Sequence, residues 1–200
     1  MTPERKARIE QVAARRQPDL TVFMEQVHKP HNLAAMLRTC DAVGVMRAHA
    51  VPASGGIPTL NHTAQGAQRW VELVRHPTTE SGLRHLKAQG FRLYAAHFSD
   101  RAVDFRQPDY TLPTAFVMGT EKFGVSELAR DLVDQEIVIP MVGMAQSLNV
   151  SVATSILLFE AQRQRENAGS LGANPLDQAP WQDLVEGWIQ RDLDRYRKRE

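Results

Sequence analysis

Cysteine is nearly absent from this 200-residue sequence, in which Cys40 is the only one. A single cysteine cannot form an internal disulfide, and it excludes a zinc site built from a cysteine cluster. The seven histidines are scattered along the chain without the regular spacing of metal ligands. We therefore expect a protein that binds no metal.

Long apolar runs are also missing from the sequence. No stretch approaches the roughly 18 apolar residues that a membrane-spanning helix requires. The first residues are rich in charge, whereas a secretory signal contains an apolar segment followed by small residues. These features predict a cytoplasmic protein that does not associate with a membrane.

Neither sign of charge dominates, because 24 Lys and Arg residues oppose 23 Asp and Glu residues. The basic residues are unevenly placed, since residues 1–16 carry five of them and only two glutamates. A basic helix on a nearly neutral body favours a polyanionic partner, although such a run is more often a solvated helix face.

Strand-like and helix-like segments alternate through the chain. The predicted strands are residues 20–24, 48–51, 71–74, 91–98, 115–118 and 137–139. The predicted helices are residues 3–15, 33–43, 80–89, 125–133, 150–165 and 181–198. This alternation predicts an α/β fold with a mainly parallel sheet and helices on both faces.

The chain is long enough for one well-buried domain, since 42% of its residues are hydrophobic. We place that domain at residues 19–168. A basic helix at residues 1–18 precedes it. A linker rich in Gly, Pro and Asn, followed by a last helix, occupies residues 169–200.

Residues 136–165, EIVIPMVGMAQSLNVSVATSILLFEAQRQR, pass from a strand through a loop of small and amide residues into an apolar helix. We expect that helix to be largely buried. Open α/β sheets bind ligands at the carboxyl ends of strands, where Ser147 and Asn149 could hydrogen-bond one. Either residue could instead cap the helix, which is the more frequent role; the two roles are compatible.

The segment HKPHNLAAMLRTCDAVG, residues 28–44, predicts a second helix near the same edge. Asn32 is placed to cap it, and Gly44 to end it. Arg38 lies about 150° around the helix from the apolar stripe. Taken alone, it is an exposed surface arginine.

The segment TAFVMGTEKFGVSEL, residues 114–128, predicts a strand followed by a loop in which Gly119 and Gly124 flank Glu121. Ser126 is placed to cap the next helix. The spacing is not GxGxxG, so the dinucleotide-binding fingerprint is absent. Glu121 could serve a ligand, or it could pair with an arginine or with backbone donors.

These segments resemble the motifs of the SpoU/TrmH-type SPOUT RNA 2'-O-ribose methyltransferases. The similarity lies in HNLAAMLRTCDAVG, MGTEKFGVSE and IPMVGMAQSLNVSVATSILLFEAQRQR, and it extends over roughly residues 5–168. The resemblance implies a SPOUT-type α/β sheet flanked by helices, whose carboxyl-terminal part forms a deep trefoil knot. It also implies a homodimer with the reaction centre where the subunits meet.

The resemblance further implies that S-adenosyl-L-methionine donates the methyl group and leaves as S-adenosyl-L-homocysteine, without a metal. The residues expected around the cofactor are Ala96, Gly119, Ile139, Met141, Ser147, Leu148 and Asn149. Ala96 replaces a threonine found in some relatives, so only its backbone can contact the cofactor.

The family places Arg38 in the catalytic centre, with Asn32 shaping it and with Glu121 and Asn149 organising it. A guanidinium is normally protonated and has no acceptor atom, so it is a poor base. We expect Arg38 to hold the phosphate beside the target ribose and to stabilise the developing alkoxide. A phosphate oxygen, a water molecule or a carboxylate would then receive the proton.

The segments ARRQPDLTVFMEQVHKPHN and EAQRQR are most similar to family members that methylate guanosine 18 in the D-loop of tRNA. We expect RNA contacts from Arg8, Arg16, His31, Arg163 and Arg165. Phe123 offers a stacking surface for the target nucleotide, although His31 and Phe123 are equally compatible with packing.

Two alternatives stay open. The substrate could be rRNA or another tRNA position, because closely related family members methylate both. The chain could also be a non-catalytic RNA-binding protein, but such a protein needs no cofactor pocket. No obligatory protein partner other than a second copy of the chain is expected.

Overall fold

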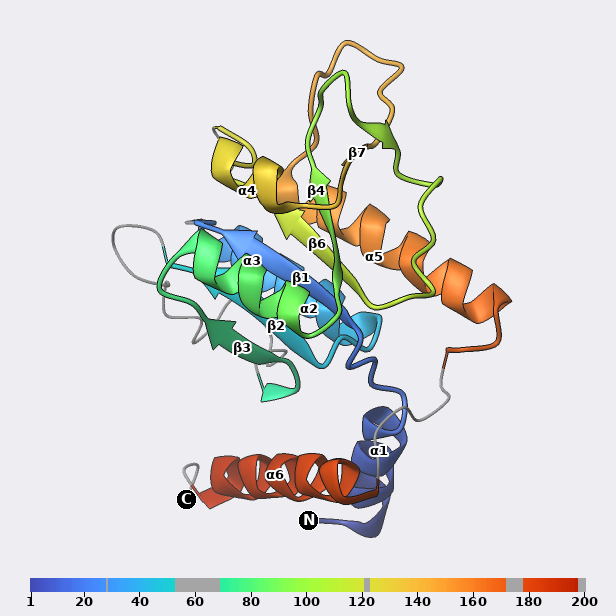
Figure 1. Cartoon of the computed structure of the whole chain (residues 1–200). Coiled ribbons are helices and arrows are strands. Elements are labelled where there is room, and N and C mark those ends of the chain that lie inside the picture. The colour runs from blue at the N-terminus through green and yellow to red at the C-terminus, as the bar shows by residue number, and fades with distance from the viewer. Residues whose placement is uncertain (28, 53–68, 121–122, 172–177, 198–200) are drawn as a thin grey trace.

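The computed structural model describes residues 1–27, 29–52, 69–120, 123–171 and 178–197 (Figure 1). Its centre is a seven-stranded sheet in the order β3-β2-β1-β6-β4-β7-β5, in which all neighbouring strands are parallel. The strands are β1 (Leu20–Glu25), β2 (Arg47–Val51), β3 (Glu72–Arg75), β4 (Arg92–Ala96), β5 (Val103–Asp104), β6 (Thr114–Met118) and β7 (Gln135–Val138).

The helices of the described residues are α1 (Pro3–Ala13), α2 (Pro30–Ala42), α3 (Thr79–Ala88), α4 (Glu127–Leu132), α5 (Val150–Asn167) and α6 (Gln178–Arg197). Each predicted strand and helix overlaps one of these elements, which confirms the α/β prediction. β5 was not predicted, because two residues are too few to show an alternating pattern. Within the described ranges, no helix is both long and apolar enough to cross a membrane.

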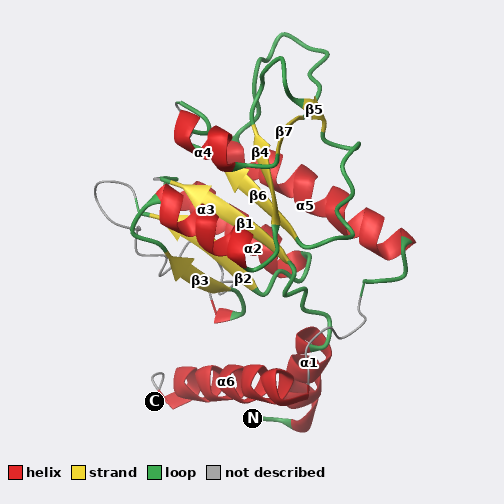
Figure 2. Cartoon of the chain, viewed as in Figure 1, coloured by secondary structure: helices red, strands yellow, loops and turns green. Residues whose placement is uncertain are grey.

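Helices cover both faces of the sheet (Figure 2). Val22 and Met24 of β1 point into a core cluster that includes residues of α2 and α5. Phe23, between them, points into a second cluster formed with α3 and α4. All six residues of β1 are buried, as expected for a central strand of a parallel sheet.

α5 is less buried than the sequence predicted. Leu157 and Leu158 are completely buried, but Val152 is 46% exposed and Phe159 is 52% exposed. The expectation that this helix is largely buried is therefore wrong for a single chain, in which five of its 18 residues are buried. Large apolar side chains remain accessible on one side of α5.

α1 and α6 pack against each other at one end of the molecule (Figure 1). Ile9 and Ala13 of α1 form a small core with Val185 and Trp188 of α6. An ion pair of 2.9 Å between Arg5 and Asp192 also joins the two helices. The terminal segments thus form one helical unit, although they are at opposite ends of the sequence.

Candidate active site

A cleft of about 510 Å³ opens at the carboxyl ends of β4 and β6 and at the start of α5. It adjoins a smaller cavity of about 140 Å³, with which it shares Ala96, Ser147 and Leu148. All the predicted cofactor residues line one or both: Ala96, Gly119, Ile139, Met141, Ser147, Leu148 and Asn149. Segments distant in the sequence therefore meet in one place.

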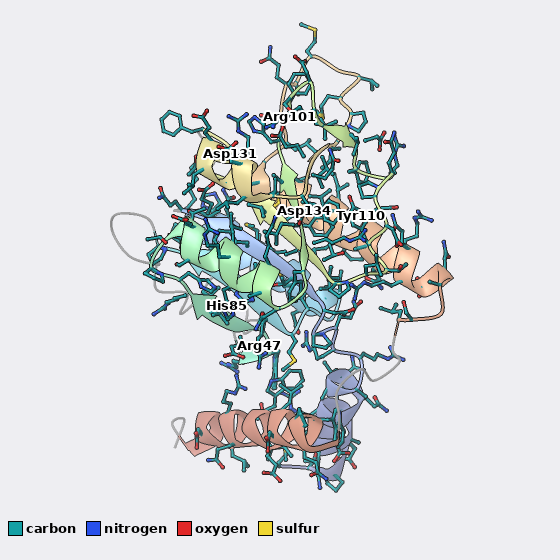
Figure 3. The ribbon with its side chains drawn as sticks, viewed as in Figure 1. Arg47, His85, Arg101, Tyr110, Asp131 and Asp134 are labelled. Atoms are coloured by element: carbon teal, nitrogen blue, oxygen red, sulfur yellow. The ribbon has the colours of Figure 1, made fainter. Side chains whose placement is uncertain are left out.

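A larger hollow of about 640 Å³ lies at the opposite ends of β4 and β7. It contains none of the predicted site residues. Asp134, which lines it and is labelled in Figure 3, is already paired with Lys87 at 3.0 Å. We do not assign the active site to this hollow, although it is larger, because the described residues of the three predicted motifs do not line it.

Gly119 sits where the backbone folds back on itself. A Cβ atom there would lie 2.0 Å from the carbonyl carbon and oxygen of Gly124. Thr120 and Gly124 close the loop, with each backbone N–H donating to the other's carbonyl oxygen at 2.9 Å. Only glycine fits this position. The two hydrogen bonds between Thr120 and Gly124 hold together the ends of the loop that lines this side of the cleft. The predicted Glu121 lies outside the described residues.

Asn149 caps α5, because its Oδ1 accepts from the backbone N–H of Ser151 at 2.8 Å. Its Nδ2 donates to Oδ1 of Asn32 at 3.1 Å. Capping and site formation are thus combined in one residue, as the sequence allowed. The first turn of α2 is brought to the start of α5.

The predicted capping role of Asn32 is wrong. α2 begins at Pro30, and its N-cap residue Lys29 makes no side-chain cap hydrogen bond. Asn32 lies inside the first turn, is 1% exposed, and binds Asn149. A buried amide needs a hydrogen-bond partner, and Asn149 supplies one to Asn32.

Arg38 is exposed on α2, away from the buried residues of that helix, as predicted. Its neighbour Thr39 forms a hydroxyl contact of 2.9 Å with Ser155 of α5, which fixes the two helices side by side. Arg38 lies about 9 Å farther along the helix axis than Asn32. It does not line either cavity of its own chain in the described part of the molecule.

The structure buries two of the five residues that were predicted to contact RNA. Arg16 is 1% exposed: it forms an ion pair with Asp41 and lies 4.8 Å above the ring of Trp188. Arg165 is 3% exposed and donates to Oδ1 of Asp19 at 2.7 Å and to the carbonyl of Tyr110 at 2.9 Å. Both guanidinium groups are hydrogen-bonded within the fold, which disfavours a role in phosphate binding.

The other three predicted RNA residues reach the surface. Arg8 and His31 are exposed. The side chain of Arg163 is 57% exposed and forms an ion pair with Glu160 at 2.7 Å. These residues stay candidates for RNA contact, with Arg163 able to exchange its partner for a phosphate.

His97 and Phe98 also line the cleft, directly after the predicted cofactor residue Ala96. Burial and the nearby guanidinium of Arg130 lower the pKa of His97, so its imidazole is neutral at neutral pH. Phe98 is 82% exposed at the rim. They directly follow β4 at the carboxyl edge of the sheet, which is where open α/β sheets bind ligands.

Glu136 anchors the segment that follows β4. Its buried carboxylate accepts from the hydroxyl of Ser99 and from Nη2 of Arg101, the latter at 2.6 Å (Arg101 is labelled in Figure 3). Burial raises the pKa of Glu136, but the bonds from Ser99 and Arg101 outweigh that effect and hold the pKa below its usual range. The cleft wall formed by His97 is thereby tied to β7.

No group of three or more His, Cys, Asp or Glu side chains within the described ranges is arranged to hold a metal ion. The polar groups around the cleft include backbone groups, the amides of Gln146 and Asn149, the hydroxyls of Thr120 and Ser147, Lys29 and His97. Such donors suit an organic ligand with hydrogen-bonding edges.

Known proteins resemble this chain in sequence. A family model described as the SpoU rRNA Methylase family matches residues 19–159. A tRNA (guanosine(18)-2'-O)-methyltransferase from Thermus thermophilus is 54% identical over 190 residues, which are 95% of this chain and 98% of that protein.

Solved structures resemble the fold as well. The Aquifex aeolicus TrmH/SpoU tRNA modifying enzyme matches with a TM-score of 0.89 and 42% identity, over 94% of this chain and 96% of that one. The SpoU methyltransferase AviRb from Streptomyces viridochromogenes, in complex with AdoMet, matches with a TM-score of 0.68 and 27% identity. That match covers 76% of this chain and 62% of AviRb.

Proposed function

Because the chain belongs to the SpoU rRNA methylase family, we propose that it methylates RNA, and specifically the ribose 2'-hydroxyl of guanosine 18 in the D-loop of tRNA. The observation that carries this proposal is the convergence of all the predicted cofactor residues on one cleft. The choice of substrate follows the Thermus thermophilus relative, which bears that activity in its name and is similar over 95% of this chain.

S-adenosyl-L-methionine is the methyl donor in this proposal. The cleft volume of about 510 Å³ suits a ligand of that size. Gly119 lets the loop that lines the cleft fold back closely on Gly124, and the residues near Ile139 and Leu148 can present backbone groups to an adenine edge. When bound, the sulfonium supplies an electrophilic methyl group.

Arg38 is assigned to the target nucleotide. A bidentate guanidinium can hold the phosphate beside the ribose and stabilise negative charge as the 2'-oxygen loses its proton. It does not take the proton, because it has no acceptor atom. Asn32 and Asn149 set the position of α2 relative to the cleft, and Glu121 completes the site.

A homodimer supports this assignment. Arg38 does not line the cleft of its own chain, whereas apolar side chains near that cleft are open: Val142 is 105% exposed and Met144 is 100% exposed. A second copy that covers these residues and the accessible side of α5 would remove apolar surface from water. Arg38 of the partner subunit would then complete the cleft. The knot of the family is part of the same proposal.

tRNA is the macromolecular partner, bound by phosphate contacts from Arg8 and Arg163 and by His31 near the target nucleotide. The basic helix at residues 1–18 extends the RNA surface beyond the catalytic domain at residues 19–168, and residues 169–200 form a linker and a last helix. A cytoplasmic location follows from a tRNA substrate. No other protein partner is required.

The proposal is tested by incubating the purified protein with labelled S-adenosyl-L-methionine and unmodified tRNA transcripts, followed by mapping of the methylated nucleotide. We expect one 2'-O-methyl group at guanosine 18. Label on a base, or on rRNA alone, would contradict the proposal. The absence of any transfer, with tRNA still bound, would favour a non-catalytic RNA-binding protein.

A further inference from the structure

Glu25 ends β1 and is only 4% exposed, although it lines neither part of the cleft. The preceding residue Met24 is paired with Met118, which ends the neighbouring strand β6 and does line the cleft. A buried carboxylate is costly unless donors surround it. The donors to Glu25 therefore identify what this residue holds in place.

The carboxylate of Glu25 accepts hydrogen bonds from the first residues of two helices. Oε1 accepts from the hydroxyl of Thr79 at 2.9 Å and from the hydroxyl of Ser126 at 2.6 Å. Oε2 accepts from the backbone N–H of Ser126 at 2.9 Å. Glu25 thus joins the end of β1 to the starts of α3 and α4, which lie on the same face of the sheet (Figure 1).

Ser126 is the carboxyl-terminal anchor of the loop that forms one wall of the cleft. It caps α4 through its Oγ, which accepts from the backbone N–H of Ala129 at 3.2 Å. The loop begins at Gly119, whose close approach to Gly124 fixes the other end. Ser126 is two residues from Gly124, which is hydrogen-bonded to Thr120, and both Thr120 and Gly124 line the cleft.

The chain after Glu25 leads to the other wall of the cleft. Gln26 adopts a φ of 51°, a left-handed conformation that is rare outside glycine, and its N–H donates to the carbonyl of Val51 at 3.2 Å. α2 then begins at Pro30 and brings Asn32 to Asn149. The end of β1 therefore does two things. It leads into α2, and through Glu25 it holds Ser126, at the end of the loop from Gly119 to Ser126 that precedes α4 (the α4 loop).

We propose that Glu25 is a positioning residue for methyl transfer, because its carboxylate sets the α4 loop against the α2 segment on the two sides of the cleft. It does not touch the reacting atoms. The inference rests on the proposed function and extends it to a residue to which the family resemblance assigns no role.

The test compares Glu25→Gln with the control Thr79→Val. Glutamine keeps the size of the side chain but presents an amide to the Ser126 donors, one of which loses its acceptor. We expect kcat to fall by about tenfold to a hundredfold, while KM for tRNA changes by less than about twofold. Thr79→Val removes only the bond from α3, so its kcat should stay within about twofold of the unmodified protein.

A double-variant cycle separates positioning from general stability. If Glu25 acts through Ser126, then Glu25→Gln should reduce kcat less in a Ser126→Ala background than in the unmodified protein. Its effect should be independent of Thr79→Val. An unchanged kcat in Glu25→Gln would overturn the inference, as would equal losses of kcat in Glu25→Gln and Thr79→Val at equal losses of Tm.

Two further outcomes are decisive. Should Glu25→Gln fail to fold, Ser126→Ala alone carries the test, and a kcat equal to that of the unmodified protein would overturn the inference. Should the unmodified protein methylate no tRNA, the proposed function fails, and affinity for S-adenosyl-L-homocysteine replaces kcat as the readout. Weaker binding in Glu25→Gln but not in Thr79→Val would support positioning, whereas equal binding in both would contradict it.

Discussion

The side-chain amide of Asn149 donates to Oδ1 of Asn32 at 3.1 Å while its own oxygen caps α5 through Ser151. One side chain therefore begins a helix and joins that helix to α2. The two roles use different atoms of the amide, so substitution can separate them.

Asn149→Asp should lower activity without a comparable loss of stability. The carboxylate keeps an acceptor for the cap, but it has no N–H for Asn32 and places negative charge beside an oxygen. We expect kcat to fall by at least about tenfold with a nearly unchanged Tm. Asn149→Ala, which removes both contacts, should in addition lose about 1 kcal/mol of unfolding free energy. Single-turnover assays and thermal melting distinguish the two variants. Full activity in Asn149→Asp would show that the hydrogen bond from Asn149 to Asn32 is not needed for catalysis.

Gly119→Ala should damage the cleft, because its Cβ would lie 2.0 Å from the backbone of Gly124. Relief of this overlap requires backbone movement, at a cost of about 1–3 kcal/mol. We expect at least about tenfold weaker S-adenosyl-L-homocysteine binding by calorimetry. Gly143→Ala is the matched control, since a Cβ there meets nothing within 4 Å. Equal S-adenosyl-L-homocysteine affinity in the two variants would show that the backbone near Gly119 can accommodate a Cβ atom without damage to the cleft.

Arg165→Met should destabilise the fold. The guanidinium is 3% exposed and donates to Asp19 and to the carbonyls of Tyr110 and Leu112, which methionine cannot satisfy. We expect a loss of about 3 kcal/mol of unfolding free energy in urea titrations. A stable variant with weakened tRNA binding would instead restore the original assignment of Arg165 to RNA.

Arg8→Ala should have the opposite profile. Its side chain is exposed on α1, so the unfolding free energy should change by no more than about 0.5 kcal/mol. If Arg8 contacts a phosphate, tRNA affinity falls and the slope of log affinity against log salt decreases by about one. Arg84→Ala on α3, another exposed arginine, serves as the control. An unchanged salt slope in Arg8→Ala would remove α1 from the RNA surface.

His49 should make the fold sensitive to acid. Burial, together with the neighbouring His76, His85 and Arg47, lowers the pKa of His49 to about 3 (His85 is labelled in Figure 3). Below pH 6.5 the unfolded chain takes up a proton that the folded chain refuses until about pH 3. Stability is therefore full above pH 6.5 and falls as the pH drops toward 3.

Between pH 7 and pH 5 this single histidine should remove about 2 kcal/mol from the unfolding free energy. Urea titrations across this range measure the slope. His49→Gln should flatten it, whatever its effect on stability at pH 8. An equal slope in the variant would assign the acid sensitivity to other groups.

The elements of the fold were predictable because local pattern and burial agree. Strands of a parallel sheet are apolar on both faces, and the run at residues 20–24 shows this directly. Caps were predictable where the side chain stands directly before its helix. Ser126 and Asn149 occupy the N-cap positions of α4 and α5 as predicted, whereas Asn32 lies inside the first turn of α2 and binds Asn149.

The sequence predicted which loops form the cleft, but it did not predict which of the basic side chains are exposed. Arg16 and Arg165 belong to a basic pattern, yet carbonyl groups and acids from remote segments enclose them. Nothing in the local sequence marks that enclosure, because the partners belong to other elements. The role of Glu25 could not be predicted for the same reason, because its hydrogen-bond donors come from the starts of α3 and α4.

The central ladder of the sheet also bears on how the chain is made. Leu20 lies opposite Thr114 and Met24 opposite Met118, so β1 has no partner on that side until β6 has left the ribosome. Distant pairings of this kind form slowly, and they leave apolar strands uncovered in the meantime. Nascent chains shorter than this point should depend on chaperones, and a premature stop before β6 should give aggregates rather than a weakened enzyme.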